Sequence, residues 1–135
     1  MSGGESGWRR GDVLEAVRSA PSVGLAVLGG QVQFLLPDGT CELYWLDYDP
    51  SGRHRTEPFP TYAKRSCGET IAAFQRVLAM GLVHEGVTSF KHLQRAEAQG
   101  VLLEDCLLFI VYFATAEEAG EANTGDRRPN QGRTR

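Results

Sequence analysis

Short apolar runs, separated by turn residues, dominate the chain between residues 23 and 59. Strand-like runs occupy residues 23–28, 31–36 and 41–48, and a weaker fourth spans 53–59. Gly, Pro and Asp favour tight turns, and they gather in the breaks between the runs. These breaks are Gly29-Gly30, Pro37-Asp38-Gly39-Thr40 and Asp49-Pro50-Ser51-Gly52. The pattern predicts an antiparallel meander of three or four strands.

Three further segments have apolar residues at helical spacing. Residues 12–20 form the first, because Pro21 prevents its continuation. Residues 66–81 form the second, and Ser66-Cys67-Gly68-Glu69 matches a capping box at its start. Residues 89–99 form the third, which Gly100 ends.

The last apolar segment, residues 101–115, predicts a buried strand that Glu104-Asp105 splits with a turn. Strands followed by helices are typical of the α+β class. We therefore expect an antiparallel sheet of four to five strands, a meander with about three helices mostly on one face. The final strand is expected beside the meander. The sequence leaves open which sheet face the helices cover.

Length and composition predict one domain. Both ends are polar, so residues 1–7 and 117–135 are predicted to be disordered around a single α+β domain at 8–116. The net charge of −3 is too small to favour nucleic acid, and the apolar run at 106–114 is too short to span a membrane. Three cysteines without CxxC spacing indicate a reducing cytoplasm.

Cys67 is the sharpest catalytic candidate. If Ser66 caps the second helix, Cys67 lies in the first turn, where the helix dipole favours a thiolate. The alternative is a small residue that fills the turn. Cys41 and Cys106 fall on predicted strands, where packing accounts for them.

Two other groups of polar residues have metal or acid–base chemistry in principle. His84, Glu85 and His92 do not match a zinc-binding spacing, so we predict no metal and no cofactor. Two acid pairs could serve as general acid and base, but each falls where a turn is expected. These pairs are Asp47 with Asp49 and Glu104 with Asp105.

Aromatic and basic residues are concentrated in the meander and its exit. In the third strand, alternation places Glu42, Tyr44, Leu46 and Tyr48 on one face. Aromatic residues and arginines are favoured anchors of protein interfaces. The predicted partner-binding residues are Tyr44, Tyr48, Tyr62, Arg53 and Arg55. The alternative is that a helix covers these side chains.

One stretch of the second half resembles a known family. Residues 86–101, GVTSFKHLQRAEAQGV, are similar to the C-terminal half of the YbcV-like family of small bacterial and prophage proteins. The matching residues are Gly86, Thr88, Phe90, Ala96 or Ala98, Gly100 and Val101. The aromatic that follows in the family is replaced by Leu102-Leu103 here. The resemblance implies an α+β order and a bacterial or phage origin.

Together these features favour a small non-enzymatic interaction or regulatory protein of bacterial or mobile-element origin. It would bind a protein partner or itself through an aromatic sheet face. One alternative is a thiol-dependent enzyme or redox sensor that uses Cys67. The other is a small-molecule-binding domain with a pocket between sheet and helices.

Overall fold

Four strands and four α-helices make up most of the chain that the computed structural model describes, residues 4–119. Two short 3-10 segments, η1 (Pro21–Val23) and η2 (Leu103–Cys106), join them. The elements follow in the order β1 (Gly4–Trp8), α1 (Arg10–Ser19), β2 (Ala26–Leu36), β3 (Gly39–Asp47), α2 (Phe59–Leu78), α3 (Leu82–Ser89), α4 (Lys91–Ala98) and β4 (Leu107–Ala114). The predicted α+β class is confirmed, with one α-helix more than expected.

The strands form one antiparallel sheet in the order β1-β4-β2-β3. β4 is the most continuously apolar strand, and its central position buries most of its side chains. The prediction that the final strand joins the sheet beside the earlier strands is therefore confirmed. Leu36 pairs with Gly39 across the predicted turn that joins β2 to β3.

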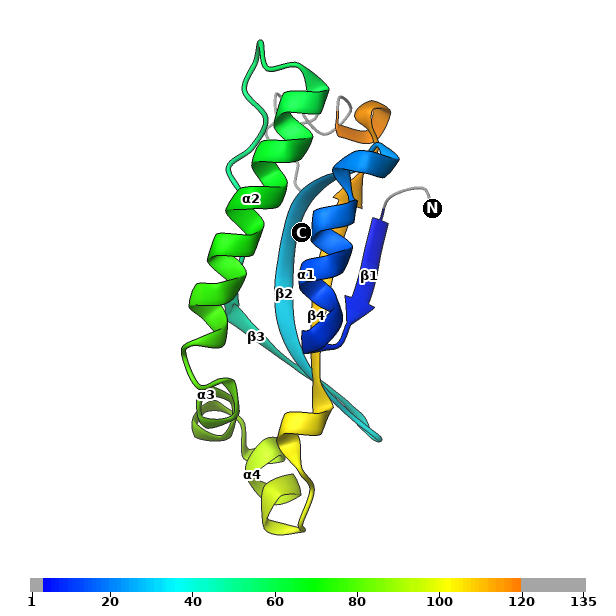
Figure 1. The fold of residues 1–135 in the computed structure, drawn as a ribbon. Coiled ribbons are helices and arrows are strands. Elements are labelled where there is room, and N and C mark those ends of the chain that lie inside the picture. The colour runs from blue at the N-terminus through cyan, green and yellow to red at the C-terminus, as the bar shows by residue number, and fades with distance from the viewer. Residues whose placement is uncertain (1–3, 120–135) are drawn as a thin grey trace, which may run out of the picture.

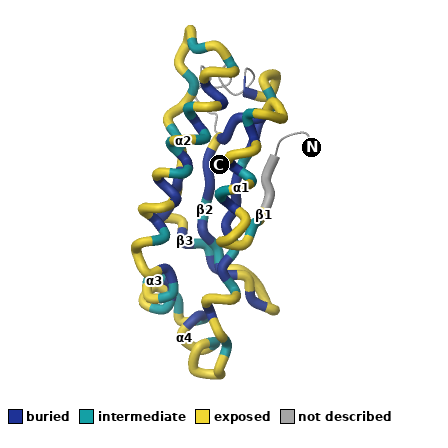
Figure 2. Tube along the Cα trace, in the orientation of Figure 1, coloured by how far each residue is buried: buried dark blue, intermediate teal, exposed yellow. Residues whose placement is uncertain are grey.

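Helices α1 and α2 lie side by side on one face of this sheet (Figure 1). The core fills the space between the two layers, and the burial colours of Figure 2 follow it along the inner sides of both helices. Its largest members include Phe34, Phe74 and Phe109. The described helices leave most of the opposite face uncovered, and α2 reaches it only at one end, where it packs against Ala26 and Ala114. We call this uncovered part the open face. Its side chains are Leu28, Gln31, Gln33, Leu35, Glu42, Tyr44, Leu108, Ile110 and Tyr112.

Helix α2 begins seven residues earlier than the sequence predicts, at Phe59 instead of Ser66. Pro60 suits the first turn because its missing N–H would be unpaired there anyway. Ser66 is fully buried in the middle of the helix and does not cap it. Its hydroxyl donates to the carbonyl of Ala63 and accepts from the Val27 N–H at 3.0 Å, which ties α2 to β2. The predicted capping box is wrong.

Two other predictions about strands are wrong. Residues 53–58 form no strand, and they belong to the loop between β3 and α2. Residues 4–7 were expected to be disordered but lie in β1, which pairs with β4 from Gly4 to Trp8. Backbone hydrogen bonds hold β1 in place, and the apolar content of the segment gives no hint of them.

The Gly29-Gly30 pair is also not a hairpin turn. β2 runs without a break from Ala26 to Leu36, so the predicted strands 23–28 and 31–36 are one strand. Neither glycine has a positive φ, so a turn does not require them. They are required because the side chains of Tyr48 and Asp49 occupy the space that a Cβ atom would fill.

In the second half of the chain, the structure agrees more closely with the elements predicted from the sequence. The predicted helix at 89–99 is α4, although α3 before it was not predicted. Glu104-Asp105 lies in η2, but it does not split a strand in two as predicted, because the strand begins only after it, at Leu107. Of the predicted disordered tail, residues 117–119 are helical and 120–135 lie outside the described residues. Within the described chain, no helix combines the length and apolar character that crossing a membrane requires.

Candidate functional site

The predicted aromatic anchors separate into one exposed and two buried side chains. Tyr44 on β3 is 75% exposed and lies on the open face. Tyr48 is buried between the sheet and the helices, and Tyr62 is buried where α2 packs against Ala26 and Ala114, so the expectation that they form a surface with Tyr44 is wrong. The alternation along β3 fails after Leu46 because the strand departs from its regular pairing there.

Tyr48 is a core residue whose hydroxyl is satisfied by backbone. The phenol donates to the carbonyl of Ile110 at 2.6 Å or to that of Gln31 at 2.8 Å, and its ring meets Phe74 edge-on. Burial raises the pKa of Tyr48 far above its ordinary value. Tyr48 therefore joins β2, β4 and α2 and is not available to a partner.

Tyr62 belongs to a second, smaller core at one end of the sheet. It packs with Ala26, Ala114 and Ala119, and its ring lies 5.5 Å from the Arg65 guanidinium carbon. This cluster seals the end of the molecule where β2 begins and β4 ends.

The two predicted arginines lie in the loop that leads from β3 to α2. Arg55 is exposed. Arg53 donates from Nε to the carbonyl of Glu57 at 2.9 Å and stacks over Phe59. Both arginines thus lie in the same loop, and within the described residues no hydrogen bond or ring contact joins either of them to Tyr44.

Arg65 of α2 fixes this loop. Its guanidinium bonds both carboxylate oxygens of Glu57 at 2.8 Å, pairs with Glu69, and donates to the carbonyls of Ser51 and Gly52. The hydrogen bonds from Arg65 lower the pKa of Glu57 to about 2. This cluster explains how a loop without regular secondary structure keeps one conformation.

Cys67 lies in the middle of α2, not in its first turn. Its thiol is half-buried and donates to the carbonyl of Val17 at 3.2 Å. Burial raises the pKa of Cys67, which is the opposite of the shift that a reactive thiolate requires. Cys41 is buried on β3, and burial raises its pKa as well.

The other chemical candidates hold no site. Within residues 4–119, no group of three or more His, Cys, Asp or Glu side chains could hold a metal ion. His92 of α4 instead bonds Asp38, which lies in the turn between β2 and β3, at 3.1 Å. The space between sheet and helices, where the alternative hypothesis of a small-molecule-binding domain placed its pocket, is filled by the core.

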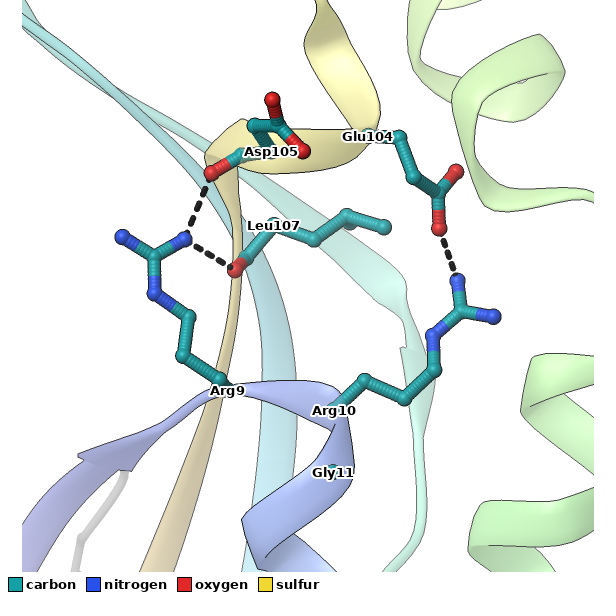
Figure 3. Close-up of a pocket in the computed structure, with 6 residues that line it drawn as sticks. All are labelled: Arg9, Arg10, Gly11, Glu104, Asp105 and Leu107. Carbon is teal, nitrogen blue, oxygen red and sulfur yellow. Dashed lines mark hydrogen bonds and ion pairs between the residues drawn. The ribbon is translucent and has the colours of Figure 1, made fainter.

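A shallow hollow of about 540 Å³ lies where β1 meets α1, beside η2 (Figure 3). Arg9 reaches from one side to the carbonyls of Asp105 and Leu107, and Arg10 pairs with the Glu104 carboxylate. Both arginines are thereby used to hold the β1–α1 corner against β4. The predicted acid pair Glu104 and Asp105 supports this corner in the fold.

The most distinctive hollow is a groove of about 530 Å³ on the open face. It lies where β3 separates from β2, since pairing jumps from Gln33–Glu42 to Gln31–Asp47. One β2 residue therefore spans four residues of β3. The groove is lined by Leu28, Gly29, Gly30, Gln31, Glu42, Tyr44, Leu46, Asp47, Asp49 and Tyr112.

At the floor of this groove β2 presents only the backbone of Gly29 and Gly30, because Tyr48 packs closely against one face of these residues and Asp49 against the other. We call this arrangement the clamp. A Cβ on Gly30 would lie 1.8 Å from a Tyr48 ring carbon, and one on Gly29 would lie 2.3 Å from the Asp49 carboxylate. The Gly30 N–H donates to Asp49 Oδ1 at 2.9 Å. Only glycine at both positions allows the clamp to close.

The walls of the groove are acidic and aromatic. Three carboxylates line it (Glu42, Asp47 and Asp49), and no lysine or arginine is among its described lining residues. Neither Glu42 nor Asp47 forms an ion pair within residues 4–119. The acid pair Asp47 and Asp49 thus lies in a groove, although turn chemistry had accounted for it.

Tyr44 is held pointing outward by the residues behind it. Its ring meets Trp45 edge-on at 5.1 Å, and Trp45 stacks on Phe90 at 6.0 Å. The Trp45 indole N–H donates to Glu85 of α3 at 3.0 Å. β3 is therefore fastened to α3 by Trp45, which leaves Tyr44 as an exposed aromatic at the groove wall.

Sequence reasoning placed Glu42, Tyr44 and Leu46 together, and all three line the groove. It missed Leu28 and Tyr112, which come from β2 and β4. Alternation along β4 could have placed Tyr112 opposite the core, but nothing in the sequence shows that this face lacks a helix. Comparisons with protein-family models, with curated proteins and with solved structures returned no match for this chain.

Proposed function

We propose that this chain is a protein-binding module that acts through the open face of its sheet. The carrying observation is that α1 and α2 leave most of the other face uncovered, and that this face holds the groove and an outward-held Tyr44. Leu28 and Leu35 are also exposed on this face. Exposed aromatic and aliphatic side chains on one rigid surface are typical of interaction sites.

The arrangement of the sheet supports this function better than it supports thiol chemistry. The residues of the open face come from strands that are hydrogen-bonded to their neighbours, so their backbone positions are fixed before a partner arrives. A preorganised surface loses little conformational entropy on binding. By contrast, the raised pKa of Cys67 counts against a thiol-dependent enzyme.

Site-specific photo-crosslinking tests the proposal. A benzoylphenylalanine placed at Tyr44 or Leu35 should give the same covalent adduct in native extract. The control positions are Val23 and Leu102, which are more exposed than Leu35 and lie off the open face. The proposal requires the adduct from Tyr44 and Leu35 and its absence from both controls. Adducts of equal yield from all four positions, or from the controls alone, would overturn it.

A further inference from the structure

The open-face groove selects a partner by charge. Among its described lining residues, Glu42, Asp47 and Asp49 supply negative charge and no side chain supplies positive charge. The arginines of the described chain lie at the corner between β1 and α1, on the helices α1, α2 and α4, and in the loop before α2, and none of them lines the groove. The groove therefore complements a cation that another molecule brings.

A second copy of this chain, docked face to face, does not meet that requirement. It would place carboxylates opposite carboxylates, and like charges across an interface are costly. Its open face has no lysine or arginine among the side chains that define it. Charge complementarity instead favours a basic segment of a different protein.

Among the basic side chains of such a segment, the residues in the groove walls favour arginine over lysine. A planar guanidinium stacks on aromatic rings and bonds carboxylates through two N–H groups at once. Tyr44 and Tyr112 supply the rings beside Glu42 and Asp47. Leu28 and Leu46 supply apolar surface for the neighbouring residues of such a segment.

We infer that the open-face groove binds an arginine-bearing segment of a partner protein, with the guanidinium between Tyr44 and the Glu42 and Asp47 carboxylates. This inference rests on the proposed function and specifies the chemistry of the partner. The groove volume of about 530 Å³ lies within the range of clefts that bury drug-sized ligands, which is enough room for an arginine side chain.

Fluorescence anisotropy with synthetic peptides tests the inference. The probes are fluorescein-labelled Gly-Leu-Xaa-Leu-Xaa-Leu-Gly peptides in which Xaa is Arg, Lys or Gln, measured at 150 mM salt. We expect the arginine peptide to bind at least ten-fold more tightly than the glutamine peptide and several-fold more tightly than the lysine peptide. No binding of the arginine peptide, or equal affinity for arginine and lysine, would overturn the inference.

A matched pair of variants separates the groove from general attraction to an acidic protein. Glu42→Gln with Asp47→Asn removes two groove charges, whereas Glu15→Gln with Glu97→Gln removes two exposed charges on α1 and α4. The first pair should weaken the arginine peptide at least ten-fold and the second less than two-fold. Equal loss in both variants would overturn the assignment, and thermal melting must show that both remain folded.

Amide spectra of the full chain give a readout that does not depend on affinity. The arginine peptide should shift the Gly29 and Gly30 resonances of the groove floor.

To find whether the chain's own arginines compete, Arg127, Arg128, Arg133 and Arg135 are changed together to Gln. A gain in peptide affinity of ten-fold or more would assign the groove to this chain's own segment and overturn the partner assignment; unchanged affinity supports it. If the crosslinker at Tyr44 gives the expected adduct but the arginine peptide does not bind, the proposed protein-binding function stands and the inference of an arginine-bearing partner is wrong.

Discussion

At the scale of single residues, Gly29 and Gly30 show how one signal in a sequence has two physical meanings. A Gly-Gly pair between apolar runs is typical of a hairpin turn. Here both glycines lie inside β2, and their missing side chains make room for Tyr48 and Asp49. The sequence alone could not separate these meanings, because the approaching residues are 18 to 20 positions away.

Gly30→Ala should destabilise the fold, because its Cβ would overlap the Tyr48 ring. Overpacking of this kind costs about 1–3 kcal/mol. Gly68→Ala is the matched control, since Gly68 lies in α2 with open space around its Cα. We expect the control to stabilise by about 0.5–1 kcal/mol through helix propensity. Urea unfolding followed by circular dichroism measures both, and equal stability of the two variants would contradict the clamp.

Ser66 is a second residue whose role changed between sequence and structure. Ser66→Ala would leave the buried Val27 N–H without its acceptor, at a cost of about 1–3 kcal/mol. Ser19→Ala removes an exposed hydroxyl that bonds only within α1, and should change the unfolding free energy by less than about 0.5 kcal/mol. If Ser66→Ala unfolds at the wild-type urea concentration, Ser66 does not tie α2 to β2.

At the scale of elements, the long periodic segments were predictable and the weakly patterned ones were not. α1, the hairpin turn and β4 follow from apolar spacing and turn chemistry. β1 was missed because backbone pairing with β4, and not its own apolar content, holds it. The expected strand at 53–59 was wrong because its polar residues bond to Arg65 and the loop instead.

The Arg65 cluster makes the loop before α2 sensitive to acid. The folded pKa of Glu57 is about 2, below its ordinary value of 4.5. A group with a lowered folded pKa stabilises the fold fully above 4.5, and that stability is lost as the pH falls toward 2. Glu57→Gln should therefore be less stable than wild type at pH 6 and nearly equal to it at pH 2.

Thermal melts across this range measure that difference. The control is Glu15→Gln, which removes an exposed carboxylate of α1. The hydrogen bond that Glu15 accepts from Ser19 goes to its backbone carbonyl, so this substitution leaves it in place. The melting temperature of the control should fall between pH 6 and pH 2 by the same amount as that of the wild type. If Glu57→Gln and wild type differ by the same amount at pH 6 and at pH 2, the Arg65 cluster does not stabilise the fold through the Glu57 charge.

At the scale of the whole molecule, the uneven covering of the sheet is the feature that sequence could not supply. The strand pattern predicted which side chains alternate, and Tyr44 with Glu42 was placed correctly. It could not tell which of the two faces α1 and α2 would cover. Tyr48 is lost from the predicted interface because it lies under the helix layer, and Tyr62 is lost because it packs from α2 against Ala26 and Ala114.

The most direct test of the account compares side-chain oxidation by hydroxyl radicals in the purified chain and in native extract. Tyr44, Leu28 and Leu35 report on the open face, and Met80, exposed where α2 meets α3, is the internal control. The account predicts that extract protects the three open-face residues and leaves Met80 oxidised as before. Equal oxidation of Tyr44 in both samples, or protection confined to Met80, would contradict a function of the open face.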